Sequence, residues 1–282
     1  MRVRSVAVAL VLIAAEGRSA RPEAVVEATP GLAAEDRANL ERNLRWILAR
    51  ERATRSEKAT VGVYADAGAW HPSARGLVGA LEGVGVPCRV LDRELLTTEG
   101  FAGLKALVFP GGWAPFQRDA LGARGQAALK DFVEGGGRFL GVCAGAYLVS
   151  REVRWARESL AYPLGLFDGT AEGPIEGLAI WPAAGPARVN TTDAGRKRGL
   201  AKLEGATFYY QGGPRFTGGT GAEVLATWAD GTAALIARRV GKGELLLTGL
   251  HLERPPPADG GDDAPAPKDA GPLLKALLVP AH

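Results

Sequence analysis

Short, nearly continuous apolar runs alternate with amphipathic segments through the first half of the chain. A parallel strand covered on both faces gives an apolar run, whereas an amphipathic helix repeats its apolar residues every three or four positions. By these rules, helices are predicted over residues 32–53, from Ser73 past Leu81, and over 121–134. The predicted strands of this half cover residues 61–64, 86–91, 104–109 and 138–142.

This alternation predicts an α/β fold with a doubly wound, mostly parallel sheet and helices on both faces. In such sheets the functional site lies beyond the carboxyl ends of the strands. Three loops are therefore expected to meet at one edge, namely residues 65–72, residues 110–116 and the segment around Cys143.

The second half is richer in strand patterns, separated by Gly and Pro turns. Residues 254–272 are rich in Pro, Asp and Gly and are predicted to form a flexible surface loop. A short closing helix is predicted over 273–278. The candidate strands cover residues 178–181, 187–190, 207–210, 223–228, 233–239 and 244–248.

The first residues have the pattern of a secretory signal. Arg2 and Arg4 precede a short apolar run over 5–15, and small residues that suit cleavage follow it. The alternative is an extra buried strand or helix. We therefore expect a signal peptide over residues 1–19, a helical extension over 20–57 and one domain over 58–282. The protein would then be secreted or periplasmic, and without a signal it would be cytoplasmic.

Composition and charge narrow the classes of function. The chain has 282 residues, of which 46% are hydrophobic and 23% are charged, and its formal net charge is +3. This is an ordinary globular composition, and no segment after the first residues is apolar enough for a membrane span. The densest basic cluster, Arg196 to Arg198, is interpreted as a solvated loop. Neither a nucleic-acid partner nor an integral membrane span is expected.

The segment Gly141 to Gly145 joins a predicted strand to a helix-like run over 146–151 and has Cys143 at its centre. Small residues in such a turn leave room for one raised side chain, as in a nucleophile elbow. The amide groups at the start of the following helix would stabilise a Cys143 thiolate. The alternative is a small buried cysteine at a strand end. Cys88, within a strand pattern, is interpreted as a packed structural residue.

A cysteine nucleophile needs a base and a group that orients the base. Among the three histidines, His251 follows an apolar strand and lands at the same edge of the sheet as Cys143. Glu253 lies two residues on, where an extended segment would point it in the same direction. His71 is more often a surface residue of the first loop, and the C-terminal His282 is expected to be exposed.

Pro110 is followed by two glycines, whose backbone N–H groups are not screened by side chains. Gly111 or Gly112, together with the N–H of Ala144, is predicted to form an oxyanion hole. The histidines and cysteines lack the spacing of metal ligands, so no metal and no cofactor are expected. The side chains predicted to shape the substrate pocket are Trp113, Tyr147, Tyr210 and Gln211.

Several of these motifs together resemble a class I glutamine amidotransferase-like domain, and more closely the biotin–protein ligase N-terminal domain family. The resemblance covers about residues 60–253 and implies a flavodoxin-like sheet. It also implies that Cys143, His251 and Glu253 occupy the positions of a catalytic triad. The segments that carry it are 109–112 (FPGG), 130–137 (KDFVEGGG), 140–147 (LGVCAGAY), 209–216 (YYQGGPRF), 241–244 (GKGE) and 251–253 (HLE).

This sequence departs from the amidotransferase pattern four residues after the cysteine. Glutamine amidotransferases usually have Gln there, which helps to hold the substrate, and this chain has Tyr147. These residues also contain no biotin-binding or ATP-binding motif, so the resemblance concerns a domain and not ligase activity.

The leading hypothesis is a cysteine hydrolase of an amide or related acyl bond, with a small-molecule substrate that the sequence does not name. The alternatives are a binding or regulatory module that retains the fold, and a peptidase-like variant. The oligomeric state stays open.

Overall fold

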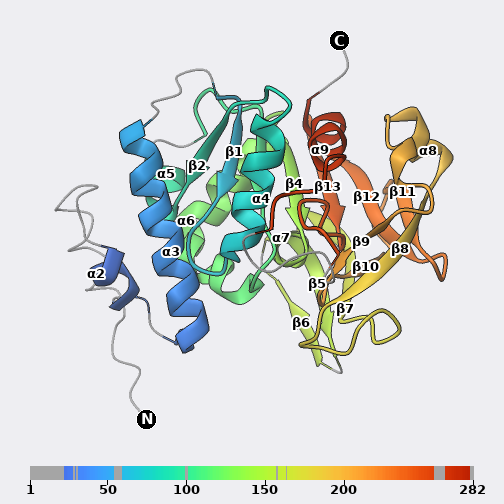
Figure 1. The fold of residues 1–282 in the computed structure, drawn as a ribbon, viewed down its shortest axis with the longest axis horizontal. Coiled ribbons are helices and arrows are strands. Elements are labelled where there is room, and N and C mark those ends of the chain that lie inside the picture. Colours follow the sequence, from blue (N-terminus) through green and yellow to red (C-terminus); the bar gives the residue numbers. More distant parts are fainter. Residues whose placement is uncertain are drawn as a thin grey trace.

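The computed structural model describes residues 22–27, 29, 31–53, 59–98, 101–156, 158–162, 164–256 and 264–279. Over this part of the chain, thirteen strands join into one sheet with helices packed against it (Figure 1). The helices are α2 (Pro22–Glu27), α3 (Ala34–Ala53), α4 (His71–Glu82), α5 (Arg93–Thr98), α6 (Ala114–Glu134), α7 (Ala144–Val149), α8 (Asp193–Lys197) and α9 (Ala270–Leu278), with a 3₁₀ turn at Ala201–Leu203. The strands of the first half are β1 (Val61–Tyr64), β2 (Cys88–Leu91), β3 (Ala106–Phe109) and β4 (Arg138–Val142). The later strands are β5 (Ser150–Trp155), β6 (Glu158–Ala161), β7 (Phe167–Gly173), β8 (Gly185–Thr191), β9 (Thr207–Tyr210), β10 (Arg215–Thr217), β11 (Glu223–Trp228), β12 (Ala233–Val240) and β13 (Gly243–Thr248).

Five neighbouring strands, in the order β2-β1-β3-β4-β13, form a parallel region. All four residues of β1 and of β3 are buried, which explains why these strands read as apolar runs. Helices cover both faces of this region. The predicted α/β fold is therefore confirmed, and so are the four strands of the first half.

Antiparallel strands extend the sheet beyond β13 in the order β12-β10-β7-β5-β6, with β7 and β5 parallel to each other. A branch of β11, β8 and β9 pairs with β12 and lies at the right of Figure 1. The sequence did not predict β5, β6, β7 or β10. The strand predicted over 178–181 is wrong: this segment is a loop, in which Ile180 is 76% exposed.

Two separate cores fill the space between the sheet and its helices. One contains apolar residues of α3, α4 and α9, and the other contains those of α5, α6 and α7. The helix predicted over 32–53 is confirmed as α3, and the closing helix is α9. The helix-like run predicted to reach residue 151 ends earlier, at Val149, because Ser150 begins β5 and its hydroxyl donates to the carbonyl of Ala146.

Strand register places the ends of β4 and β13 side by side. Thr248 pairs with Val142, and the N–H of Cys143 donates to the carbonyl of Thr248 at 2.8 Å. The segments that follow these two strands, which carry Cys143 and His251, therefore start at the same edge of the sheet.

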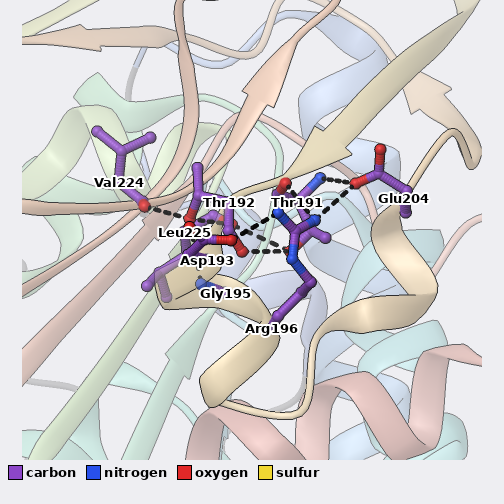
Figure 2. Close-up of polar contacts among 8 residues, drawn as sticks. All are labelled: Thr191, Thr192, Asp193, Gly195, Arg196, Glu204, Val224 and Leu225. Carbon is purple, nitrogen blue, oxygen red and sulfur yellow. Dashed lines mark hydrogen bonds and ion pairs between the residues drawn. The ribbon is translucent and has the colours of Figure 1, made fainter.

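The basic cluster around Arg196 lies at α8, far from that edge. Figure 2 shows the Thr192 hydroxyl accepting from the N–H of Gly195, which caps the helix, and Arg196 reaching two carboxylates. Those carboxylates belong to Asp193 and Glu204. Arg198 also pairs with carboxylates, those of Glu223 and Glu244. The positive charges of Arg196 and Arg198 are thus compensated by acidic neighbours, as is common for ion pairs on a protein surface.

The predicted signal peptide over 1–19 lies outside the described residues, and so does His282. Among the helices that the structure describes, none combines the length and the apolar character that crossing a bilayer requires. The loop predicted over 254–272 is described only in part. Its first residue, Arg254, is buried, and its last residues belong to α9, so the prediction of a flexible surface loop is wrong at both ends.

Candidate active site

Cys143 sits in a strained turn between β4 and α7. Its backbone has φ 49° and ψ −103°, in a region that residues with a side chain rarely adopt. A Cβ atom on Gly141 would overlap the backbone of Gly145, so the tight turn requires glycine there. Cys143 is 6% exposed and its thiol also lies 3.6 Å from the carbonyl oxygen of Gln211. The strain and the placement at a helix start are the geometry of a nucleophile elbow.

His251 is hydrogen-bonded to Cys143 on one side and to Glu253 on the other. Its Nδ1 lies 2.8 Å from Glu253 Oε1, and both side chains are almost completely buried. The segment is a turn rather than the extended stretch that the sequence predicted. The carboxylate nevertheless reaches the imidazole, and the structure brings all three predicted residues together.

Aromatic rings hold the imidazole of His251 in place. Trp70 and Tyr209 both present their rings to it edge-on, with centroids 5.8 and 5.5 Å away. The backbone N–H of His251 donates to the carbonyl of Tyr209. The ring is thus fixed from two sides as well as by its two polar partners.

The protonation of His251 follows from this environment. Burial by itself lowers the pKa of the imidazole, but the charge of Glu253 and the hydrogen bonds to Cys143 and Glu253 outweigh it and raise the pKa to about 10. The raised pKa keeps the imidazole of His251 protonated beside Cys143 at neutral pH. An imidazolium next to a cysteine is also the group that can later give a proton to a leaving amine.

Ser73 is a site residue that the sequence analysis named only as the start of a predicted helix. Its hydroxyl donates to Glu253 Oε1 at 2.5 Å and accepts from the N–H of Gly111 at 3.1 Å. The residue is completely buried. Ser73 therefore ties the carboxylate to the loop after β3, and a lone serine at the start of a helix gave no signal of this.

Of the three predicted oxyanion donors, two have the required freedom. The N–H of Gly111 is taken by Ser73. Within the described chain, the N–H groups of Gly112 and Ala144 have no hydrogen-bond partner, and both residues line the same cavity as Cys143. Gly111 has another role, because a Cβ atom there would overlap Cε1 of His251.

A cavity of about 610 Å³ opens above these groups. Trp113, Tyr147 and Gln211, which the sequence analysis expected to shape a substrate pocket, line this cavity. Tyr210 does not: its ring packs against Trp228, and its hydroxyl bonds the N–H of Ile175 and the carbonyl of Gly213. The prediction that Tyr210 shapes the pocket is therefore wrong.

Much of the cavity wall comes from residues that the sequence analysis did not single out. They lie in the loops after β1 and β7, in the β5–β6 hairpin and at the start of α3. These segments meet only in the folded chain. Nothing in the sequence signalled this role for Trp181, which stood in a predicted strand over 178–181 and is 41% exposed in the structure. These residues include Trp70, Trp155, Glu158, Leu160, Tyr162, Trp181, Glu35 and Asp36.

The remaining candidate side chains have structural positions. His71 is buried rather than on the surface: its Nδ1 lies 2.8 Å from Oδ1 of Asn43 in α3. Cys88 is buried in β2, and burial raises the pKa of its thiol to about 12, in keeping with a packed structural residue. In the described part of the chain, His, Cys, Asp and Glu side chains form no cluster of three that fits a metal ion.

Comparison with known proteins places the chain in a family. The family model described as "Biotin-protein ligase, N terminal" matches residues 59–269. Biotin–protein ligase of Schizosaccharomyces pombe is 29% identical over 180 residues, which are 58% of this chain and 28% of that protein. The pyridoxal 5'-phosphate synthase subunit PdxT of Deinococcus radiodurans is 30% identical over 197 residues, 69% of this chain and 89% of that protein.

A third relative is an uncharacterized protein of Chlamydia muridarum, 30% identical over 159 residues, 52% of this chain and 60% of that protein. The chain thus spans less than two thirds of the length of two of these relatives.

Solved structures share the fold. A glutamine amidotransferase crystal structure superimposes with a TM-score of 0.51 and 23% identity, covering 69% of this chain and 91% of that chain. PurLQS from Thermotoga maritima gives a TM-score of 0.54 at 16% identity, with 78% and 98% covered. The fold is therefore that of class I glutamine amidotransferase-like proteins. The family model matches well over half of the residues of this chain, and the chain therefore belongs to the biotin–protein ligase N-terminal domain family.

Proposed function

We propose that the protein is a cysteine-dependent hydrolase of an amide or related acyl bond. The observation that carries the proposal is the strained, buried Cys143 hydrogen-bonded to His251, which Glu253 orients from behind. A nucleophile held in an elbow, a base and an orienting carboxylate are what covalent acyl transfer requires.

The reaction proceeds in two halves. The Cys143 thiolate attacks the carbonyl carbon of the amide, and the N–H groups of Gly112 and Ala144 bind the oxygen that becomes negative. Protonated His251 gives its proton to the leaving nitrogen, the C–N bond breaks, and an acyl thioester stays on Cys143.

In the second half, neutral His251 takes a proton from water as the water attacks the thioester. The C–S bond breaks, the carboxylic acid leaves, and the thiolate and the imidazolium are restored. Glu253 keeps the imidazole in one orientation throughout both halves.

The alternative is a ligand-binding module that has kept the fold. Tyr147 favours it, because this residue stands where amidotransferases usually have Gln, and its hydroxyl is committed to the carbonyl of Gly212 at 2.9 Å. Its buried ring offers no amide with which to hold glutamine. Substrate recognition must then depend on other groups of the cavity.

The test compares the purified protein with its Cys143→Ala variant. Both are incubated with glutamine and a panel of small amides, and released ammonia is measured. Hydrolysis that disappears in the variant supports the proposal. If no amide is hydrolysed and iodoacetamide fails to alkylate Cys143 at neutral pH, the binding module is favoured instead.

The cellular location is a second proposal, from the basic and apolar residues at the start of the chain. We infer that residues 1–19 are a signal peptide and that the mature protein is secreted or periplasmic. Sequencing the N-terminus of the mature protein tests this, and a retained Met1 would refute it.

A further inference from the structure

We propose that the cavity binds neutral amides whose acyl group carries an aromatic ring or a similarly large apolar body, in preference to free glutamine. The inference rests on the proposed function only for the bond that Cys143 attacks. The preference for an aromatic or large apolar acyl group comes from the cavity wall, and binding measurements detect it without turnover.

Three tryptophans form a continuous wall beside Cys143. The ring centroids of Trp113 and Trp155 are 5.5 Å apart, and those of Trp155 and Trp181 are 5.2 Å apart. Tyr147 continues the wall, with its ring 5.6 Å from that of Trp155. Aromatic side chains give large apolar area and favour edge-on or offset contacts with another ring. A flat apolar group can lie along this wall.

The apolar surface continues to the mouth of the cavity. Leu160 is 40% exposed and Trp181 is 41% exposed, and both line the cavity. Of the four large apolar side chains that are exposed in the described chain, Leu160 and Trp181 line the cavity, whereas Ile180 and Val224 do not. Exposed apolar side chains that line a cavity suit an apolar ligand.

The charges in the cavity disfavour free glutamine. Neither Lys nor Arg is among the described residues that line it, while Glu35, Asp36 and Glu158 bring three carboxylates. The positive charge of His251 is already shared with Glu253 and Cys143. The α-carboxylate of an amino acid would therefore enter without a cationic partner, which costs free energy when water is removed.

The size of the cavity agrees with a larger ligand. Its volume of about 610 Å³ is within the range of roughly 300–1,000 Å³ that is typical of sites for drug-sized molecules. The start of α3 and the β5–β6 hairpin also supply parts of the wall. A substrate with an extended apolar acyl group would contact both the nucleophile and these walls.

The test measures binding to the Cys143→Ala protein by calorimetry, so that no ligand is consumed. The ligands are 3-phenylpropanamide, butanamide, 4-carbamoylbutanoate and glutamine. We expect 3-phenylpropanamide to bind about tenfold more tightly than butanamide, from the apolar area that the ring buries. The two ligands that carry a carboxylate should bind more weakly than butanamide.

Two substitutions at neighbouring positions test whether the preference for the ring depends on the cavity wall. Trp181→Ala should remove most of the preference for the ring, whereas Ile180→Ala, outside the cavity lining, should leave it unchanged. Both positions are exposed, so neither variant should lose its fold, and circular dichroism checks this. Equal or tighter binding of glutamine or 4-carbamoylbutanoate overturns the inference. So does a ring preference that survives Trp181→Ala.

Hydrolysis is scored separately with the unmodified protein. Cys143-dependent release of ammonia from glutamine alone would uphold the proposed function and overturn this inference. Tight, Trp181-dependent binding of 3-phenylpropanamide without hydrolysis of any amide would uphold the inference and remove the proposed function.

Discussion

At Gly111 the missing side chain is what allows the imidazole of His251 to approach the loop after β3. A Cβ atom at this position would overlap Cε1 of His251, which Glu253 and two aromatic rings hold in place. Gly111 thus affects the site by leaving room for the imidazole of His251 rather than by any chemistry of its own. Its N–H, which the sequence analysis assigned to the oxyanion, is used to fix Ser73.

The Gly111→Ala substitution should therefore displace His251 and reduce alkylation of Cys143 by iodoacetamide at neutral pH by at least about tenfold, since the thiolate loses its partner. It should also destabilise the fold by roughly 1–3 kcal/mol, as expected for overpacking. Gly79→Ala is the matched control, because nothing lies near a Cβ atom there. That change, inside α4, should stabilise by about 0.5–1 kcal/mol and leave alkylation unchanged. Equal alkylation rates for the two variants would contradict the argument.

Ser73 acts at the same scale, through Glu253. The Ser73→Ala substitution leaves the carboxylate with one fewer donor and the N–H of Gly111 without an acceptor. We expect a loss of about 1–3 kcal/mol in the free energy of unfolding, together with a shifted pH profile of Cys143 alkylation. Ser150→Ala is the control, since Ser150 is equally buried but bonds only the carbonyl of Ala146. It should cost stability without moving the pH profile, and a profile unchanged in both variants would mean that Ser73 is only structural.

At the scale of elements, the carboxyl ends of the parallel strands set the positions of the site. One such end is secured by a buried ion pair: Asp66, just after β1, bonds the guanidinium and the N–H of Arg93 at the start of α5. Burial by itself raises the pKa of Asp66, but Arg93 outweighs it and the pKa is lowered. The pair therefore stabilises the folded state at pH values above the unfolded pKa of an aspartate, about 3.9.

Asp66→Asn should cost about 3 kcal/mol at pH 7, because Arg93 is left without its counter-charge in a mostly buried position. The difference from the unmodified protein should shrink as the pH falls below about 4, where Asp66 takes up a proton in the unfolded chain, and should disappear once the pH falls through the lowered pKa of Asp66 in the folded protein. Urea unfolding at pH 7 and pH 3 measures this. Asp119→Asn, which removes an exposed pair with Arg118, should cost less than about 1 kcal/mol at either pH. A cost that does not depend on pH would show that the charge of Asp66 is not what matters.

At the scale of elements, some strands and site residues could be predicted from sequence patterns alone and others could not. The buried parallel strands β1, β3 and β4 were predictable because both of their faces are covered. Cys143 was predictable because it directly follows β4, and His251 because it comes three residues after the buried strand β13. The strands β5 and β6 escaped prediction because β5 is only partly buried and all four residues of β6 are exposed, so charged and apolar residues mix along them. The cavity wall escaped for a different reason: Trp155, Trp181 and the start of α3 meet only after the chain has folded.

At the scale of the whole molecule, α3 lines the cavity beside Cys143 although it precedes the residues matched by the family model, which begin at 59. Its apolar face packs into the core shared with α4 and α9. Asn43, completely buried, donates to the carbonyl of Ala69 and bonds the ring of His71. Both contacts fix the loop that carries Trp70, and the ring of Trp70 packs against His251.

Asn43→Ala should therefore affect both the stability and the site. We expect the free energy of unfolding to fall by roughly 1–3 kcal/mol, since the carbonyl of Ala69 and the ring of His71 each lose a buried partner. Alkylation of Cys143 should slow as well, because the loop behind His251 is released. Glu41→Ala, which removes only an exposed pair with Arg45 on the same helix, should change the unfolding free energy by less than about 0.5 kcal/mol and leave the thiol unaffected. If Asn43→Ala lowered stability without slowing alkylation, α3 would support the fold but not the site. The connection between the helical extension and the chemistry would then have to be found in the cavity residues at its start, Glu35 and Asp36.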